Sequence, residues 1–144
     1  MAESARISWR LHLAAEPAAV YALLATDAGR ARFWAEAAPE RHDRIEFVFP
    51  DGTTLRAEVL RRDPPAAFAL RYFGGCIAEF RLATDGAGGT DLALEVRDVP
   101  AAQRSEDAAG WVGVLLTLKA AADFGVDLRN HHRSRTWAAG YVDN

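Results

Sequence analysis

Three side chains of this sequence could move a proton: the carboxyls of Glu79 and Asp107 and the phenol of Tyr72. A carboxyl that faces an apolar interior loses its solvation, and the raised pKa lets it act as an acid or a base. Glu79, however, alternates with Ala78 and Phe80, and a strand turns successive side chains to opposite faces. The pattern therefore favours a solvated Glu79, and acid–base catalysis stays an alternative.

Cysteine and histidine, which often serve as nucleophiles and metal ligands, are few and scattered. Cys76 is the chain's one cysteine and has no histidine near it in sequence, so we expect a small buried residue instead of a nucleophile. His131 and His132 are adjacent, and neighbouring side chains of an extended segment point apart. Since no cysteine or carboxylate pair stands nearby at ligand spacing, the sequence predicts no metal site, no catalytic residue and no cofactor.

Aromatic residues are numerous for so short a chain, with seven Phe, four Trp and three Tyr. So many large rings resist perfect packing, and Tyr72 and Trp111 each carry a polar group that can address a ligand. We therefore predict a mainly apolar cavity. Its candidate lining residues are Trp9, Phe33, Trp34, Phe47, Phe68, Tyr72, Phe80, Trp111 and Leu115.

The hydrophobic spacing defines the elements that must position these side chains. From Arg6 to Leu13 polar and apolar residues alternate, which predicts a strand. Pro17 suits the first turn of a helix, because its missing N–H would have no partner there. A second short helix follows, capped by Asp27, and a long helix is expected from Ser105 to about Val126.

Between these helices, five alternating segments are separated by turns rich in glycine and proline. Short connections between consecutive strands favour antiparallel pairing. We therefore predict an α+β domain in which a curved six-stranded antiparallel sheet wraps around the long C-terminal helix, with two short helices after the first strand. A curved sheet and a straight helix do not fill each other completely, so a cavity is expected between them.

Length and composition predict one domain over residues 1–144. A chain of this size can bury a core without a metal or a disulfide, and the lone cysteine favours a reducing, cytoplasmic environment. The N-terminus lacks the apolar core of a secretory signal, and no apolar stretch is long enough for a membrane span. A net charge of −3 without a basic stripe argues against nucleic acid as a partner.

The final segment, residues 126–144, is polar apart from a few large side chains such as Trp137 and Tyr141. Because isolated exposed tryptophan is unfavourable, we expect this tail to fold back on the domain or on a partner subunit. A homodimer or another protein partner is therefore an open alternative.

Several short motifs occur in an order that resembles a known superfamily. Residues 17–24, PAAVYALL, look like the helix after the first strand in the START-like, or SRPBCC, helix-grip superfamily. Residues 89–94, GTDLAL, together with the Gly-Trp pair at 110–111 and LLTLK at 115–119, resemble the ending of bacterial homologues of the activator of the heat-shock-protein ATPase. One departure is Glu16, where the family often has a Ser or Asp helix cap.

The resemblance implies a broad range of functions, because the superfamily includes lipid and hormone carriers, polyketide cyclases and dehydratases, and co-chaperone domains. The leading hypothesis is a non-enzymatic protein that binds a small apolar molecule between the sheet and the long helix. One alternative is a cyclase- or dehydratase-like enzyme that uses Glu79, Tyr72 or Asp107. Another is a co-chaperone-like module that binds a protein.

Overall fold

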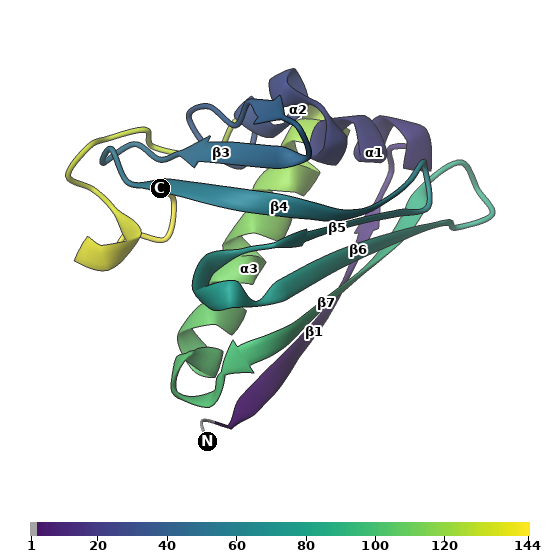
Figure 1. Cartoon of the computed structure of the whole chain (residues 1–144). Coiled ribbons are helices and arrows are strands. Elements are labelled where there is room, and N and C mark those ends of the chain that lie inside the picture. Colours follow the sequence, from purple (N-terminus) through teal and green to yellow (C-terminus); the bar gives the residue numbers. More distant parts are fainter. Residues whose placement is uncertain (1–2) are drawn as a thin grey trace.

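The computed structural model describes residues 3–144 as one antiparallel sheet with a long helix across one face (Figure 1). The seven strands are β1 (Ser4–Leu13), β2 (Glu40–Arg41), β3 (Arg44–Val48), β4 (Thr54–Asp63), β5 (Ala67–Arg71), β6 (Ile77–Thr84) and β7 (Thr90–Pro100). Their order is β1-β7-β6-β5-β4-β3-β2, so β2 to β7 are sequential neighbours and β1 pairs with the last strand. The predicted α+β class is confirmed. The two-residue strand β2 raises the strand count from six to seven, because two residues show no periodicity.

The helices are α1 (Pro17–Ala25), α2 (Asp27–Ala31) and α3 (Arg104–Lys119), and α3 continues into a π-helical turn, η3 (Ala120–Phe124). Short 3-10 turns are η1 (Phe73–Gly75), η2 (Ala101–Gln103) and η4 (Trp137–Ala139). In Figure 1, α3 crosses behind the strands and α1 and α2 close the upper end. Among residues 3–144, no helix combines the length and hydropathy that crossing a bilayer would need.

The cap of α2 differs from the prediction. Thr26, not Asp27, is the N-cap residue, and its side-chain oxygen accepts a hydrogen bond of 3.0 Å from the amide of Gly29. Asp27 instead accepts a bond of 2.8 Å from the buried guanidinium of Arg30. At the start of α1, Glu16 makes no side-chain capping bond.

Gly29 lets α2 pack directly on α1. A Cβ at this position would lie 2.4 Å from the carbonyl oxygen of Ala22 and 2.6 Å from the Cα of Leu23, closer than any side chain can approach. The absence of a side chain therefore sets the angle between the two short helices, and with it the direction of the loop that carries Phe33 and Trp34.

The core lies between the inner face of the sheet and the helices. Phe47, Phe68 and Phe80 are fully buried on β3, β5 and β6, and α1 contacts β5 and β6 while α3 contacts β1. Shifts of register in β1, between Ala5 and Ile7, and in β4, between Val59 and Arg61, mark irregularities of the bulge type. Such bulges bend strands, which helps the sheet curve toward the helix.

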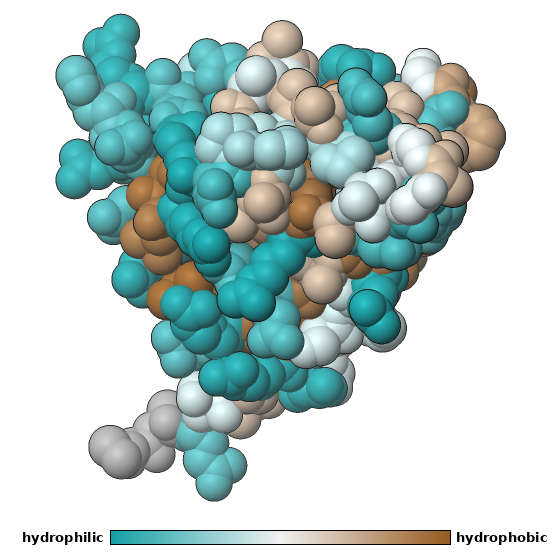
Figure 2. Space-filling view, turned by 90° about the vertical axis from the view of Figure 1, so that its right-hand side faces the viewer, coloured by the Kyte–Doolittle hydropathy of each residue, from teal (hydrophilic) through white to brown (hydrophobic). Residues whose placement is uncertain are grey.

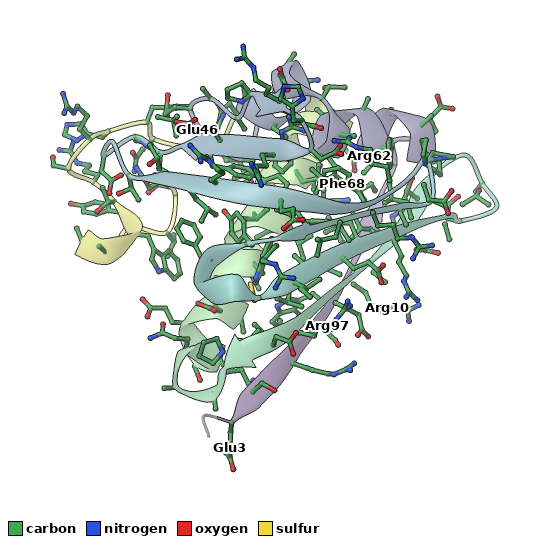
Figure 3. All side chains as sticks on the ribbon, viewed as in Figure 1. Glu3, Arg10, Glu46, Arg62, Phe68 and Arg97 are labelled. Atoms are coloured by element: carbon green, nitrogen blue, oxygen red, sulfur yellow. The ribbon has the colours of Figure 1, made fainter. Side chains whose placement is uncertain are left out.

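The outer face of the sheet is polar. Arg10 on β1 and Arg97 on β7 project from this face (Figure 3). From the side of α1 and the β6–β7 loop, hydrophilic residues likewise cover most of the surface, with hydrophobic clusters between them (Figure 2). The sheet therefore buries one face only, as the alternation in its strands predicts.

Candidate functional site

A cavity of about 380 Å³ lies where α3, the loop after α2, the β3–β4 turn and the tail meet. On α3 its lining recurs at Asp107, Gly110, Val114 and Thr117, a spacing of three or four residues that belongs to one helix face. The other elements contribute Phe33, Trp34, Ala35, Phe49, Pro50, Asp51, Thr53, Tyr72, Phe73, Cys76, Arg129, Thr136, Trp137, Ala138, Val142 and Asn144.

Three mutually contacting rings form the inner wall of this cavity. Trp34, Tyr72 and Trp111 have centroid separations of 5.7 Å (34–72), 5.0 Å (72–111) and 6.3 Å (34–111). Their planes are inclined to one another by 48°, 46° and 68°, so none is stacked face to face. A wall of inclined rings can offer both faces and edges to an apolar guest.

Carboxylates supply most of the charge around the cavity. Asp51, Glu106 and Asp107 line it, and Glu106 accepts a bond of 3.3 Å from the indole N–H of Trp137. Burial and the nearby charge of Glu106 raise the pKa of Asp107. The pKa of Asp51 is lowered by its hydrogen bonds with Thr53.

The thiol of Cys76 and the phenol of Tyr72 stay protonated at neutral pH. Cys76 is 2% exposed, and burial together with the charge of Asp107 raises its pKa to about 11. Burial also raises the pKa of Tyr72. Neither group is therefore activated as a nucleophile, since the thiolate is the reactive form of cysteine.

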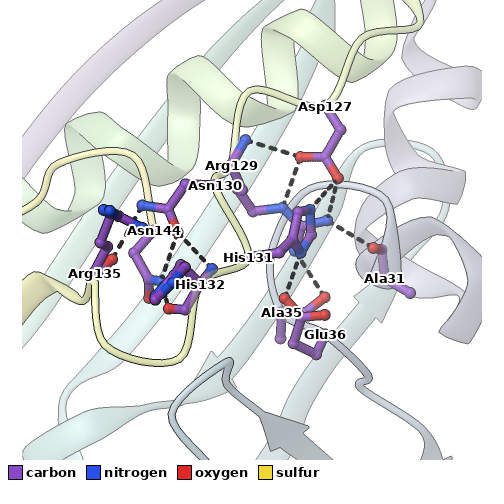
Figure 4. Close-up of polar contacts among 10 residues, drawn as sticks. All are labelled: Ala31, Ala35, Glu36, Asp127, Arg129, Asn130, His131, His132, Arg135 and Asn144. Atoms are coloured by element: carbon purple, nitrogen blue, oxygen red, sulfur yellow. Dashed lines mark hydrogen bonds and ion pairs between the residues drawn. The ribbon is translucent and has the colours of Figure 1, made fainter.

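The C-terminal tail forms one side of the cavity and is held by Arg129 (Figure 4). The guanidinium is buried and donates bonds of 2.8 Å to the carbonyl oxygens of Ala35 and Ala31. It also pairs with Asp127 at 3.0 Å. These bonds join the tail to the loop that carries Trp34 and so connect two walls of the cavity.

His131 adds a second connection beside Arg129. Its ring lies between Glu36 and Asp127, at 2.7 Å from the latter (Figure 4). The hydrogen bond with Glu36 raises the pKa of His131 against the effect of desolvation, and Asp127 adds to the rise. Within residues 3–144, no group of three or more potential ligands is arranged for a metal ion.

The comparisons with known proteins decide the fold. No protein-family model and no curated protein matches the sequence. Solved structures do: the Aha1 dimer of Colwellia psychrerythraea is similar with a TM-score of 0.75 and 22% identity, over 84% of this chain and 98% of that one. This chain has the helix-grip fold of the AHSA1-like proteins.

Two further structures with the helix-grip fold widen the comparison. An AHSA1-like protein of Aeromonas hydrophila has a TM-score of 0.70 and 19% identity, over 80% of this chain and 90% of that one. DynU16, a protein of the dynemicin biosynthetic locus, has a TM-score of 0.75 and 20% identity, over 89% of this chain and 51% of its own. At such identities the likeness establishes the fold.

The nine residues predicted to line the cavity fall into three groups according to where their side chains lie in the structure. Phe33, Trp34, Tyr72 and Trp111 line the cavity. Phe47, Phe68, Phe80 and Leu115 lie outside its lining and are buried in the core. Trp9 lies outside the lining as well; it is 40% exposed, and its indole N–H donates a bond of 3.2 Å to the carbonyl of Ala108 on α3.

The core position of Phe47 and Phe80 has a direct cause. Their centroids lie 4.9 Å and 5.7 Å from that of Trp34, so they form the layer that supports Trp34 without reaching the cavity themselves. The nine candidate residues leave out Phe49 and Phe73, whose rings lie 5.6 Å apart at the cavity. Phe49 continues the alternation of Phe47, which is the signal that could have found it.

Of the three groups considered for acid–base chemistry, Tyr72 and Asp107 line the cavity and Glu79 does not. Glu79 accepts hydrogen bonds of 3.0 Å from Arg61 and 2.9 Å from Arg81 on the outer face of the sheet. Although desolvation opposes the effect, these bonds lower the pKa of Glu79. Its carboxylate is therefore held ionised, away from any substrate in the cavity.

A second, open apolar groove lies on the far side of α3. Its lining includes Leu116, Phe124, Val126 and Leu128, which are all about half exposed or more. We name these four residues the outer groove. Large apolar side chains gathered on a surface are typical of contacts between proteins.

Proposed function

We propose that the chain binds a small, mainly apolar molecule in the cavity between α3, the loop after α2 and the tail. The observation that carries this proposal is the aromatic wall of Trp34, Tyr72 and Trp111, which borders a space of about 380 Å³. Ligand pockets typically have volumes of about 300–1,000 Å³ and apolar walls with a few polar groups. This cavity has both properties.

Thermal unfolding with a panel of fatty acids, aromatic polyketides and flavonoids tests the proposal. A ligand that binds the folded state alone stabilises it by about 2.7 kcal/mol at one hundred times its dissociation constant. For a chain of this length the melting temperature should then rise by roughly 5–10 °C. Tryptophan fluorescence should respond to the same compounds, because Trp34 and Trp111 lie in the wall.

Substitution of Gly110 locates the ligand. Gly110 lines the cavity, and a Cβ there would contact no atom within 4 Å. Gly110→Leu should therefore fill part of the space and weaken binding, while the free protein gains helix stability of about 1 kcal/mol. Gly110→Ala is the control, since it gains the same helix stability but leaves most of the space. Equal binding by both variants would place the ligand elsewhere.

We propose as a second function that two copies of the chain associate through the outer groove. Two observations support it: Phe124 is 72% exposed in an apolar groove, and one structure with the same fold is described as a dimer. Sedimentation velocity should find a dimer that Phe124→Ser dissociates. Leu60→Ser is the control, because Leu60 is an exposed apolar residue on β4 outside the groove. A monomer at every concentration contradicts the proposal.

A further inference from the structure

The carboxylates that line the cavity outnumber its cationic side chains. Across the described residues 3–144, the carboxylates of Asp51, Glu106 and Asp107 have no cationic side chain within 4.0 Å. The one arginine in the lining, Arg129, is already paired with Asp127 and bonded to two backbone carbonyls. A ligand therefore meets carboxylates that have no cationic partner and one arginine that is already fully bonded.

The aromatic wall favours the same kind of guest. The face of a tryptophan or tyrosine ring carries partial negative charge and attracts a cation that lies within about 6 Å of its centroid. Trp34, Tyr72 and Trp111 are inclined to one another, and Trp137 faces the same space from the tail. Proteins recognise quaternary ammonium groups with aromatic rings that are set at angles around a space.

We propose that the ligand of this cavity is an organic cation: an aromatic or aliphatic body that carries a quaternary or protonated amine. The inference rests on the proposed function and names the class of molecule that the cavity takes. The ammonium group would lie toward Asp107 and Glu106 and within reach of the ring of Trp111, and the apolar body would contact Trp34. An anionic ligand of the same shape would meet the repulsion of these carboxylates.

The surroundings of Asp107 support this placement. Burial raises the pKa of Asp107, and the charge of Glu106 adds to that rise; burial likewise raises the pKa of the Cys76 thiol, and the charge of Asp107 adds to it. Both shifts therefore reflect a partly desolvated space first and the negative charge of a neighbouring carboxylate second. A cation bound there relieves the repulsion between the two carboxylates, and its attraction is stronger than it would be in bulk water.

Three probes that share a naphthylmethyl body and differ in charge test the inference. Naphthylmethyl-trimethylammonium is the cation, neopentylnaphthalene is its uncharged isostere, and naphthylacetate is the anion. We expect the cation to bind about tenfold more tightly than the uncharged isostere, and the anion to bind least, as measured by equilibrium dialysis of each probe. Added salt should weaken binding of the cation only, because salt screens charge and leaves apolar burial almost unchanged.

Matched variants locate the charge that the cation recognises. Asp107→Asn and Glu106→Gln should each lower the affinity for the cation and leave the affinity for the uncharged isostere unchanged. Glu46→Gln removes the same charge from an exposed residue of β3 that lies outside the cavity, and should change neither affinity (Figure 3). Circular dichroism checks that each variant is folded, and two independent variants keep the test decisive if one is not.

The outcomes separate this inference from the proposed function. If the uncharged isostere binds as tightly as the cation, or if neither Asp107→Asn nor Glu106→Gln weakens the cation, the cavity is an apolar site and the inference is wrong while the proposed function stands. If no probe and no member of the apolar panel binds, the proposed function itself is wrong.

Discussion

The indole N–H of Trp34 donates a hydrogen bond of 3.1 Å to the phenol oxygen of Tyr72. The two residues stand 38 positions apart, one in the loop after α2 and the other at the end of β5. Both rings line the cavity, so this bond satisfies a polar atom inside an otherwise apolar wall. It also fixes the position of the loop relative to the sheet.

Tyr72→Phe should therefore destabilise the protein by about 1–3 kcal/mol, because it leaves the N–H of Trp34 without its acceptor in a buried place. Urea unfolding followed by circular dichroism measures the change. Tyr141→Phe is the control, since Tyr141 is 43% exposed. A loss no larger than that of the control would mean that water replaces the phenol oxygen.

Trp111→Ala should cost about 3–5 kcal/mol of unfolding free energy, as expected when a large aromatic residue leaves a core. Trp111 is 4% exposed and contacts Trp34, Tyr72 and Phe80. Trp9→Ala should cost clearly less, because Trp9 is 40% exposed at the edge of the sheet. The reverse order of the two urea midpoints would contradict this account of α3.

Arg129→Met should release the tail. The substitution leaves the carbonyls of Ala31 and Ala35 and the carboxylate of Asp127 without their donor. Hydrogen exchange should then speed up across residues 127–144, with less change in the sheet. Arg133→Met is the control, because Arg133 is exposed. Equal protection of the tail in both variants would show that Arg129 does not hold it.

The attachment of the tail should also depend on pH. The pKa of His131 is raised, so its contribution is fully present below the ordinary histidine value of about 6.5 and is lost as the pH rises through the higher folded value. The pKa of Asp127 is lowered, so its contribution is present above the ordinary value of about 3.9 and is lost as the pH falls through the folded value. The tail is therefore held best between these ordinary values.

Hydrogen exchange of the tail, corrected for the intrinsic pH dependence of exchange, measures this effect. His131→Gln should remove the loss of protection above neutral pH, since the uncharged side chain does not titrate. His132→Gln, the neighbouring substitution, should keep the wild-type profile. Identical profiles for the two variants would assign the pH dependence to another group.

Cys76 should resist alkylation while the protein is folded. With its pKa raised to about 11, the thiolate fraction at pH 8 is about a hundredfold smaller than that of an unperturbed thiol, and burial slows access further. Asp107→Asn should speed the reaction, because the charge of Asp107 contributes to the raised pKa. Iodoacetamide labelling followed by mass spectrometry gives the rates. Glu46→Gln should leave them unchanged.

Alternation along the strands predicted which residues face the core, because one face of the sheet packs against the helices and the other faces water. Ile45 and Phe47 are buried on β3, and Glu79 lies among arginines on the outer face. Alternation reports the face of a sheet but not depth within the core. Phe47 and Phe49 therefore look alike in sequence, although Phe47 supports the wall and Phe49 lines the cavity.

Contacts made by irregular backbone leave no periodic trace. In the sequence, Arg129 looks like a solvated residue of a polar tail. In the structure it is buried, and it donates hydrogen bonds to the carbonyls of Ala31 and Ala35. The cap of α2 is a local example. Thr26 and Asp27 are both residue types that cap helices well, and the direction of the backbone after α1 makes Thr26 the N-cap residue.

Asn144 lines the cavity, with its side-chain amide bonded to Asn130 and to the carbonyl of His132. Any polypeptide attached after this residue would begin in the lining of the cavity. A purification tag placed there would compete with ligands or block them, and a binding screen could miss every true ligand. In Figure 1 the N-terminal end of β1 lies at the bottom of the molecule, apart from the C-terminal residue, so a tag on that side would not begin in the cavity lining.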